Sequence, residues 1–355
     1  MYAAFNSISH KRKACLQPFE TLTYNGQIRR LRRLVDVVLP YYNIHDAKIT
    51  LLQYEDNAVY RIATHSGKQF VLRISATEEH TAAEQLSEMQ WLIALRHKVG
   101  LLVPEPVQTI DGEFLVTVEA VAVPEPRHCV LLHWVPGKPP AKGLGPDTAK
   151  NIGIFIARLH QYAEHFVPPA RFIRPSMGWE QLFGASSILG TESCAVSLAL
   201  TEKELLTEVG NRVREELRAI ETVVPQQGLI HADLHRDNIL ISDGKVGVID
   251  FDDCVWGHYL LDIASLLESI QRRVASNQHD YLIMREAYFA GYTQICSLSL
   301  KIDAYLQTFK VLRDMGVVNF ILNSKNARVQ EWGAARLAML MEQMRAYLEG
   351  KPSLI

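Results

Sequence analysis

A short polar segment in the second half of the chain constrains the fold more than any other part of the sequence. It reads His-Ala-Asp-Leu-His-Arg-Asp-Asn over residues 231–238, and two apolar, β-branched runs follow it at 239–241 and 245–249. The two runs are joined through an Asp-Gly pair at 243–244, which is the strongest local signal for a β-hairpin. The sequence therefore predicts a tight hairpin that returns the chain to the place where it began.

The register of this hairpin brings an amide and a carboxylate together. With Asp243 and Gly244 as the two turn residues, Asn238 lies beside Ile249 and Asp250 comes next. Convergent oxygen ligands of this kind suit Mg²⁺, which prefers a few protein oxygens together with substrate phosphates. The pattern therefore indicates a magnesium site at the point to which the hairpin returns.

The spacing of these groups resembles that of known phosphoryl-transfer sites. In protein kinases the catalytic loop reads His-Arg-Asp, four residues, then Asn, where the Asp accepts the hydroxyl proton and the Asn holds a metal. Asp233 and Asn238 keep this interval. Together with the hairpin and the Ile-Asp-Phe-Asp-Asp segment at 249–253, the run is similar to the signature of the aminoglycoside phosphotransferase and choline kinase-like family. That resemblance implies that Asp233 is the catalytic base and that Asn238 and Asp250 are the Mg²⁺ ligands.

The resemblance covers, more loosely, the chain from about residue 49 to its end, and it implies the α+β, two-lobed protein-kinase-like fold. Such a fold has a small N-lobe with an antiparallel sheet and a mainly helical C-lobe. The sequence fits the small lobe because one helix-like segment lies among five strand-like runs. The helix is expected at about 81–96 and the strands at 49–54, 58–64, 69–74, 114–118 and 129–134.

We expect three parts along the chain. Residues 1–44 form a helical extension, residues 45–134 the nucleotide-binding N-lobe, and residues 135–355 the C-lobe with the catalytic loop and the metal site. An insertion of helical texture lies at about 168–225. Relatives use helices inserted there to wall the acceptor site, so this insertion is expected to carry the specificity.

The nucleotide-covering loop of protein kinases has no direct counterpart here, since the chain has no G-x-G-x-x-G motif. The corresponding turn at 54–58 is similar to loops of the phosphotransferase family, in which small polar residues and backbone amides take over this role. Asn57 is the residue of the turn expected to contact the nucleotide, through its backbone. The alternative is an ordinary turn, in which Asn and Asp are favoured for their tolerance of unusual backbone angles.

The third strand carries an arginine where protein kinases have a lysine. By the resemblance, Arg73 contacts the donor phosphates of ATP, or of GTP, and a glutamate of the following helix holds it. Arginine keeps the positive charge and gains a planar fork, but the two residues are not interchangeable at a defined site. Glu84 and Glu88 lie four residues apart on one helix face and are both candidate partners; Glu88 is preferred because its surroundings resemble the helix consensus of the family.

The segment 130–137 runs from a strand into a Pro-Gly break. In the family this is the hinge between the lobes, whose backbone groups bind the adenine edge. The resemblance assigns this position to Leu132, His133 and Trp134.

Other polar residues near the motif are expected to support the site. Asp262 resembles the acid of the family that hydrogen-bonds the catalytic-loop backbone. Asp252 could add a second metal contact or stabilise the loop, and the structural role is preferred; His235 and Asp237 are also interpreted as supports. A protein kinase inserts a longer activation segment after Asp250 and ends it with Ala-Pro-Glu, and neither feature is present.

Composition limits the remaining classes of function. The chain has 355 residues, 48% of them hydrophobic, and a formal net charge of −2, which favours a folded protein with no nucleic-acid or anionic-membrane surface. Its five cysteines are odd in number and contain no C-x-x-C pair, so neither a disulfide framework nor a zinc site is indicated. No stretch approaches the roughly 20 apolar residues of a membrane span. A cytoplasmic location is expected, and the oligomeric state is left open.

The sequence thus predicts a phosphotransferase that moves the γ-phosphoryl group of ATP or GTP to a hydroxyl of a small molecule. An aminoglycoside, choline, homoserine or a similar compound would all fit the signature. A strongly acidic acceptor lobe would favour cationic aminoglycosides, yet the insertion mixes both signs of charge. Two alternatives are a protein Ser/Thr kinase of the bacterial stress-response type and a nucleotide-binding pseudokinase. The intact Asp233, Asn238 and Asp250 argue against the pseudokinase.

Overall fold

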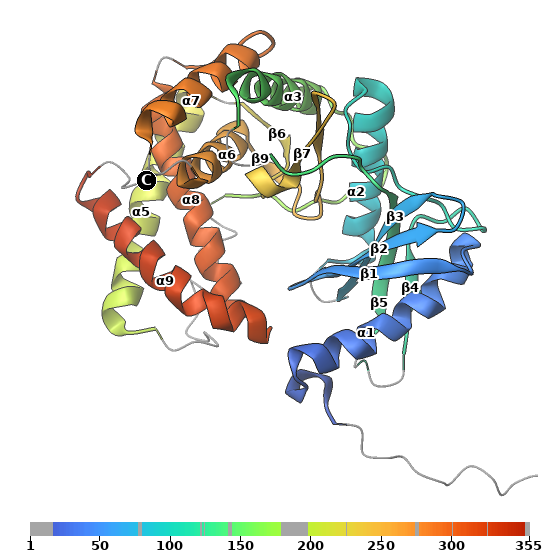
Figure 1. Cartoon of the computed structure of the whole chain (residues 1–355). Helices are drawn as coiled ribbons and strands as arrows, with labels where there is room; N and C mark the ends of the chain where they lie inside the picture. The colour runs from blue at the N-terminus through green and yellow to red at the C-terminus, as the bar shows by residue number, and fades with distance from the viewer. Residues whose placement is uncertain are drawn as a thin grey trace, which may run out of the picture.

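The structure is a computed structural model that describes residues 17–76, 80–120, 123, 125–140, 144–178, 198–224, 226–273, 277–299, 301–324 and 326–351. It has two lobes, a sheet with few helices in the N-terminal part and a mainly helical C-terminal part (Figure 1). This is the α+β organisation that the sequence predicts. Among the helices of the described ranges, none is long and apolar enough to span a membrane.

The N-lobe contains a five-stranded sheet in which every neighbouring pair is antiparallel. Its order is β1-β2-β3-β5-β4, with the bounds Ala47–Tyr54, Ala58–Thr64, Gln69–Ala76, Arg127–His133 and Val116–Val118 in that order. The five strands lie where the sequence predicts them, and their ends coincide with the predicted ones or differ by at most two residues.

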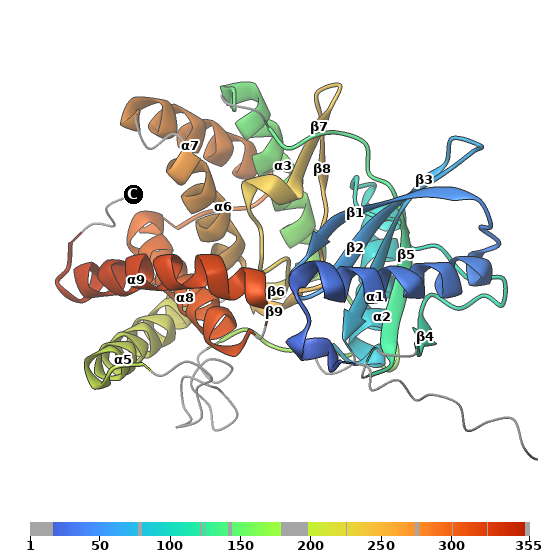
Figure 2. The ribbon, with the colours of Figure 1, turned by 60° about the horizontal axis from the view of Figure 1, so that its bottom comes forward.

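Two helices cover opposite faces of this sheet (Figure 2). Helix α1, Tyr24–Val38, begins at the side-chain cap of Thr23, and α2, Ala82–Ala94, begins at a capping box. Successive side chains of a strand point to opposite faces, and β5 shows this alternation. Cys129 and Leu131 belong to the apolar cluster that includes α1, whereas Val130 and Leu132 belong to the cluster that includes α2. In β3 the same alternation sends Arg73 to the α2 face.

The C-lobe consists of long helices around two short two-stranded sheets. The helices described are α3, α5, α6, α7, α8 and α9, with the bounds Pro146–Glu164, Leu200–Val223, Tyr259–Arg273, Gln278–Tyr292, Ile302–Asn323 and Ala327–Leu348. Strand β6, Gln227–Ile230, pairs with β9, Val255–His258, and β7, Ile239–Ser242, pairs with β8, Lys245–Val248. Within the predicted insertion, α5 is described, whereas residues 179–197 lie outside the described ranges.

Helices α3 and α7 approach each other so closely that only glycine fits at the contact. A Cβ atom on Gly153 would lie 2.1 Å from the carbonyl oxygen of Tyr288, and one on Gly291 would lie 2.0 Å from that of Lys150. This contact fixes α3, which carries His160 of the site described below.

The β7–β8 hairpin has the predicted register. Ile239 pairs with Val248, and the amide of Ile249 donates to the carbonyl of Asn238 at 3.0 Å. Both turn residues have positive φ, 50° at Asp243 and 74° at Gly244, which is the backbone that an Asp-Gly turn of type I′ requires. The hairpin therefore returns the chain from Asn238 to Asp250, as the sequence predicts.

Candidate functional site

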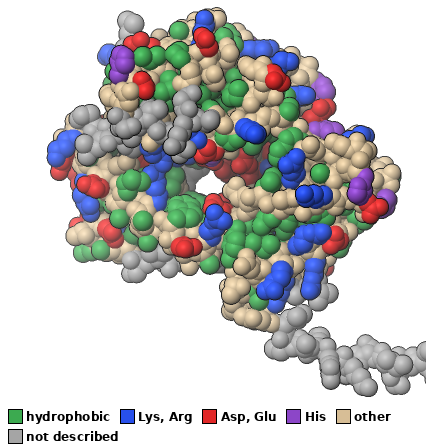
Figure 3. Space-filling view, in the orientation of Figure 1, with side chains coloured by type: hydrophobic (Ala, Val, Ile, Leu, Met, Phe, Trp, Pro, Cys, Tyr) green, Lys and Arg blue, Asp and Glu red, His purple; other side chains and the backbone are tan. Residues whose placement is uncertain are grey.

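A cleft of about 1200 Å³ lies between the two lobes. The space-filling view shows the molecule hollowed at this place, with acidic side chains gathered at one margin of the opening (Figure 3). All nine residues that the sequence nominates for catalysis, nucleotide binding or metal binding line this cleft, although they come from distant parts of the chain: Asn57, Arg73, Glu88, Leu132, His133, Trp134, Asp233, Asn238 and Asp250.

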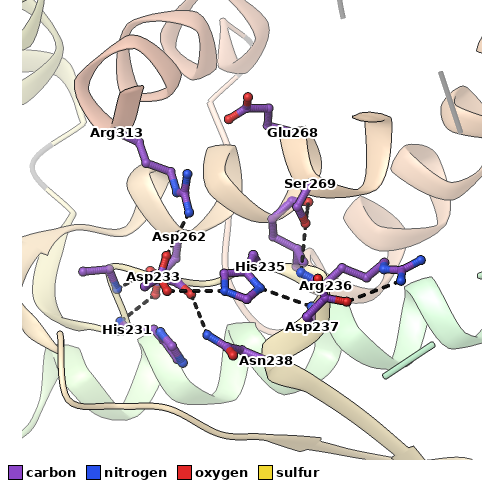
Figure 4. A network of polar contacts seen from close by, with 12 residues as sticks. His231, Asp233, His235, Arg236, Asp237, Asn238, Asp262, Glu268, Ser269 and Arg313 are labelled. Carbon is purple, nitrogen blue, oxygen red and sulfur yellow. Dashed lines mark hydrogen bonds and ion pairs between the residues drawn. The ribbon is translucent and has the colours of Figure 1, made fainter. Parts of the chain in front are cut away.

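A buried carboxylate holds the backbone of the polar loop that begins at His231. The two carboxylate oxygens of Asp262 accept hydrogen bonds from the amides of His231 and Ala232, at 2.9 and 2.8 Å (Figure 4). Ala232 has a φ of 68°, a conformation that costs a non-glycine residue energy unless its surroundings enforce it. These contacts confirm the predicted role of Asp262 and show why the loop has a fixed shape.

His160 of α3 completes this support, a role that sequence analysis did not assign to it. Its Nε2 lies 3.2 Å from an Asp262 oxygen, and its Nδ1 lies 2.9 Å from the hydroxyl of Tyr292. Burial alone would raise the pKa of Asp262, but the contacts with His160 and His231 together outweigh this effect and the pKa is lowered. Asp262 therefore stays ionised beneath the loop.

Asp233 projects from the loop into the cleft. One carboxylate oxygen is 2.8 Å from a guanidinium nitrogen of Arg313, and the other is 3.4 Å from Nε2 of His235. Burial would raise its pKa, but His235 and Arg313 outweigh burial and lower the pKa to about 2. The carboxylate is thus ionised and about a third exposed, at 36%.

Asn238 and Asp250 meet at the end of the hairpin, as predicted. The Asn238 side-chain amide donates to the backbone carbonyl of Asp233 at 3.1 Å, which leaves its oxygen as the atom that a cation could use. Asp250 has a φ of 71° and opens onto the cleft. Desolvation, followed by the charges of Asp252 and Asp233, raises its pKa well above the usual range.

This crowding of carboxylates is the environment that a bound cation relieves, so the residues present fit Mg²⁺. The described residues hold no group of three or more His, Cys, Asp or Glu side chains arranged to take a metal by themselves. Mg²⁺ is commonly held by one or two carboxylates together with substrate phosphates. One amide, one carboxylate and a nucleotide would meet that requirement.

Arg73 and Glu88 form a buried ion pair. The two guanidinium nitrogens Nη1 and Nη2 contact the two carboxylate oxygens of Glu88, the first at 2.9 Å. Glu84 instead closes the capping box of α2 with Thr81. Of the two candidate partners, the structure therefore pairs Arg73 with Glu88, and this fixes the guanidinium at the wall of the cleft.

Asp252 links this ion pair to the turn between β1 and β2. Its carboxylate accepts a hydrogen bond of 2.6 Å from the side chain of Asn57 and lies 4.0 Å from Nη1 of Arg73. Asn57 thus contacts Asp252 through its side chain. The contact of its backbone with a nucleotide stays a prediction. In the same turn, desolvation and the charges of Asp252 and Glu55 raise the pKa of Asp56 to about 7.

Arg174 is a further support that sequence analysis missed. It donates from Nε to the carbonyl of Cys254 at 2.5 Å, and its other nitrogens contact the carbonyls of Asp252 and of Glu84. Arg174 thereby ties the segment after Asp250 to the N-terminal turn of α2. A lone arginine in an irregular segment carries no sequence signal for such a role.

The predicted hinge lies against the cleft, but its amides are partly engaged. The amide of His133 donates to the carbonyl of Glu105 at 2.8 Å, and that of Trp134 donates to Gln69 at 3.1 Å. The amides of these two positions are therefore already engaged within the fold. Apolar side chains complete this end of the cleft: Leu52, Val59, Val71, Leu240 and Ile249.

Comparison with known proteins agrees with this geometry. Residues 50–296 match the model of the phosphotransferase enzyme family (APH). The chain is 25% identical over 260 residues to a homoserine kinase of Neisseria meningitidis serogroup B, covering 71% of this chain and 75% of that protein. The match spans well over half of the chain, so the chain belongs to the phosphotransferase enzyme family.

Solved structures show the same fold. A microcompartment-associated aminopropanol kinase has a TM-score of 0.74 at 27% identity and covers 90% of this chain and 98% of its own. An amicoumacin kinase, solved in complex with AMP-PNP and Ca²⁺, also has a TM-score of 0.74, at 19% identity, and covers 91% of this chain and 96% of its own. The relatives named here are kinases of small molecules, and this chain is an enzyme of the same phosphotransferase class.

Proposed function

We propose that this protein transfers the γ-phosphoryl group of ATP to a hydroxyl group of a small molecule, with Asp233 as the catalytic base. The observation that carries the proposal is the Asp233 carboxylate, which lines the same cleft as Asn238 and Asp250 and is held there by Arg313 and His235. A carboxylate with a low pKa is deprotonated at neutral pH and is ready to orient and accept the proton of a hydroxyl.

The transfer forms one bond to phosphorus and breaks another. The acceptor oxygen forms a bond to the γ-phosphorus while the bond from that phosphorus to the β–γ bridging oxygen breaks, so that ADP leaves. The acceptor proton passes to Asp233. Positioning and electrostatics supply most of the catalysis in such a transfer, and the loop contacts made by Asp262 and Asn238 provide that positioning.

Asn238 and Asp250 would hold Mg²⁺, which neutralises charge on the phosphate oxygens when it is bound. Arg73 would contact the donor phosphates, since its fork is already oriented by Glu88. The use of ATP is also supported by the AMP-PNP bound in the similar amicoumacin kinase. Asn57 and the hinge at Leu132, His133 and Trp134 would contact the remainder of the nucleotide.

The protein-kinase alternative has little support in the geometry. Strand β9 begins at Val255 and α6 follows at Tyr259, so the chain enters the helical lobe directly after Asp250. This leaves no length for the activation segment that positions a protein substrate. We therefore propose a small-molecule acceptor.

The test is a screen of ATP consumption by the purified protein against hydroxyl-bearing metabolites and antibiotics, followed by mass analysis of the product. Asp233→Asn serves as the inactive control. A product heavier by one phosphoryl group, formed by the wild-type protein only, supports the proposal. ATP binding without transfer to any acceptor would instead support the pseudokinase, and transfer to protein serine alone would support the protein kinase.

A further inference from the structure

The charged side chains that line the cleft are unevenly distributed: the side formed by three C-lobe helices carries one sign of charge only, among the described residues. On α6, α8 and α9, every charged residue that lines the cleft in the described ranges is an arginine: Arg272, Arg313, Arg328 and Arg336. The lining carboxylates lie on the opposite side, in the β1–β2 turn, on α2 and in the segment 233–253. We call the three helices with their four arginines the arginine wall. The arginine wall is the side of the cleft that Asp233 contacts, by its ion pair with Arg313.

Two acids of these helices lie behind the wall. Glu268 of α6 and Asp314 of α8 have side chains only 1% exposed and do not line the cleft. Arg336 of α9 reaches both, at 3.9 Å from Glu268 and 3.8 Å from Asp314, and Arg272 lies 3.7 Å from Glu268. Ion pairs of this length hold the guanidinium groups in place without hydrogen bonds to the two carboxylates, although Nη1 of Arg336 also donates to the sulfur of Met339.

The charges behind the wall do not neutralise it. Glu268 and Asp314 face Arg272 and Arg336 as well as Lys310, which lies 3.3 Å from Asp314. Three cations are thus set against two carboxylates, while the charge of Arg313 is offset by Asp233. Burial, followed by the charge of Arg272, lowers the pKa of Arg336. An additional negative charge would therefore be stabilised at this point of the cleft.

We infer that the acceptor carries an oxyanion, a carboxylate or a phosphate, that binds Arg336 and Arg272 while its hydroxyl lies at Asp233. The planar forks of two arginines match the geometry of such a group. Phe320 and Trp332, whose rings are stacked 6.3 Å apart, line the same wall and supply an apolar surface for the body of the molecule. A cationic terminal group would meet Arg336 and Arg272 at this place and would be disfavoured.

The inference rests on the proposed phosphotransferase function. Its test distinguishes a failure of the inference from a failure of the proposed function. Three alcohols of equal length differ only in the terminal group: 4-hydroxybutyrate, 1,4-butanediol and 4-amino-1-butanol. The kcat/KM for phosphoryl transfer is measured for each alcohol. L-Homoserine is tested in the same assay as a zwitterionic acceptor, and glycerol 3-phosphate as an acceptor that carries a phosphate. We expect 4-hydroxybutyrate or glycerol 3-phosphate to exceed the diol by at least about tenfold, the scale of a charge-assisted bidentate contact. Whichever of these two anions is preferred identifies the oxyanion.

Variants of the arginine wall locate the effect. Arg336→Met is expected to reduce the ratio of kcat/KM for the anion to that for the diol to near one, and Arg336→Lys to retain part of it. Arg272→Met should lower the same ratio less. The ratio is measured within one preparation, so a lower fraction of folded protein does not change it. Arg345→Met is the matched control, since Arg345 lies on the same helix, is exposed and is not a cleft residue.

Three results would overturn the inference. Preference for the amino alcohol, or equal use of all three alcohols, would show that the arginine wall does not select an anion while leaving the phosphotransferase function intact. A rise in the KM for ATP in Arg336→Met, with an unchanged ratio, would place this arginine on the nucleotide. Transfer to none of these alcohols or to any compound of the wider screen would overturn the proposed function as well.

Discussion

The two sides of the cleft differ in how the sequence encodes them. The acidic side takes Asp233, Asn238, Asp250 and Asp252 from 20 consecutive residues, 233–252, folded by one hairpin. The arginine wall takes its four side chains from three helices spread over residues 259–348. The predicted base and metal ligands are thus local in sequence, whereas the arginine wall depends on how helices pack. Such a division allows acceptor specificity to change while the phosphoryl-transfer machinery stays the same.

The largest effect is expected on the acidic side, from Asp250→Ala. Asn238 alone offers a neutral oxygen, so Mg²⁺-dependent nucleotide binding should be lost. Calorimetry with ATP, with and without Mg²⁺, measures the change. Asp253→Ala removes another carboxylate of the same cleft and should retain Mg²⁺-dependent binding. Unchanged affinity in Asp250→Ala would refute the ligand assignment.

Replacement of Arg73 tests the proposed contact between its guanidinium group and the phosphates of ATP. Arg73→Met should raise the KM for ATP by about tenfold or more, because a charge-assisted bidentate contact to phosphate is lost. Arg73→Lys keeps the charge without the fork and should be tolerated in part. Glu88→Gln should give a milder change of the same kind. If nucleotide binding were unaffected in Arg73→Met, the guanidinium would have only a structural role.

The role of Asp262 in holding the loop that begins at His231 is tested by the free energy of unfolding. Asp262→Asn removes the ionised carboxylate that accepts from two loop amides, so the free energy of unfolding should fall by about 3 kcal/mol, the scale of lost hydrogen bonds to a buried charged group. Because the pKa of Asp262 is lowered in the fold, its contribution is present above its ordinary pKa and is lost as the pH falls further. Urea unfolding at pH 7 and at lower pH measures both effects. A loss below 1 kcal/mol would contradict this role.

A smaller, pH-dependent effect concerns the packing behind the arginine wall. Nε2 of His258 donates to the carbonyl of Val224 at 2.8 Å, its Nδ1 accepts from the amide of Leu260 at 3.1 Å, and its ring packs against Phe309 of α8. Burial lowers its pKa to about 4. The folded state therefore binds fewer protons than the unfolded state between pH 6.5 and 4, and stability should fall as the pH drops through this window, by up to about 3 kcal/mol from this group.

The measurement is a comparison of unfolding free energies for the wild type and His258→Gln over the same pH range. The variant should start lower at pH 7, because it loses the two hydrogen bonds, and should then fall less steeply towards pH 4. Parallel curves for the two proteins would show that His258 does not titrate in this way.

Most of the acidic side could be predicted from sequence because turn chemistry and spacing determine it. The Asp-Gly pair fixes the register of the hairpin, and the register in turn sets Asn238 beside Asp250. The pairing of Arg73 with Glu88 rather than Glu84 followed from the resemblance, and the capping box explains it physically, since Glu84 is already used at the start of α2.

The contacts that sequence reasoning missed are those between distant elements. His160 and Arg174 act through buried hydrogen bonds to residues far along the chain, and nothing in their own neighbourhoods marks them. The engaged hinge amides depend on Glu105 and Gln69, which come from two other segments. The arginine wall emerges only when α6, α8 and α9 are placed around the cleft. The residue bounds of the lobes stay predictions.

The central claim is that the ionised Asp233 acts as the base in phosphoryl transfer, and a single-turnover experiment tests it most directly. Enzyme preloaded with Mg²⁺ and radiolabelled ATP is mixed with an acceptor found in the screen, and the rate of label transfer is followed for the wild type, Asp233→Asn and Asp237→Asn. Asp237 lies in the same loop with an exposed side chain, so its replacement is the matched control. We predict that Asp233→Asn binds Mg-ATP normally and transfers at least about a hundredfold more slowly, while Asp237→Asn stays near the wild-type rate. A near-normal rate in Asp233→Asn would contradict the claim.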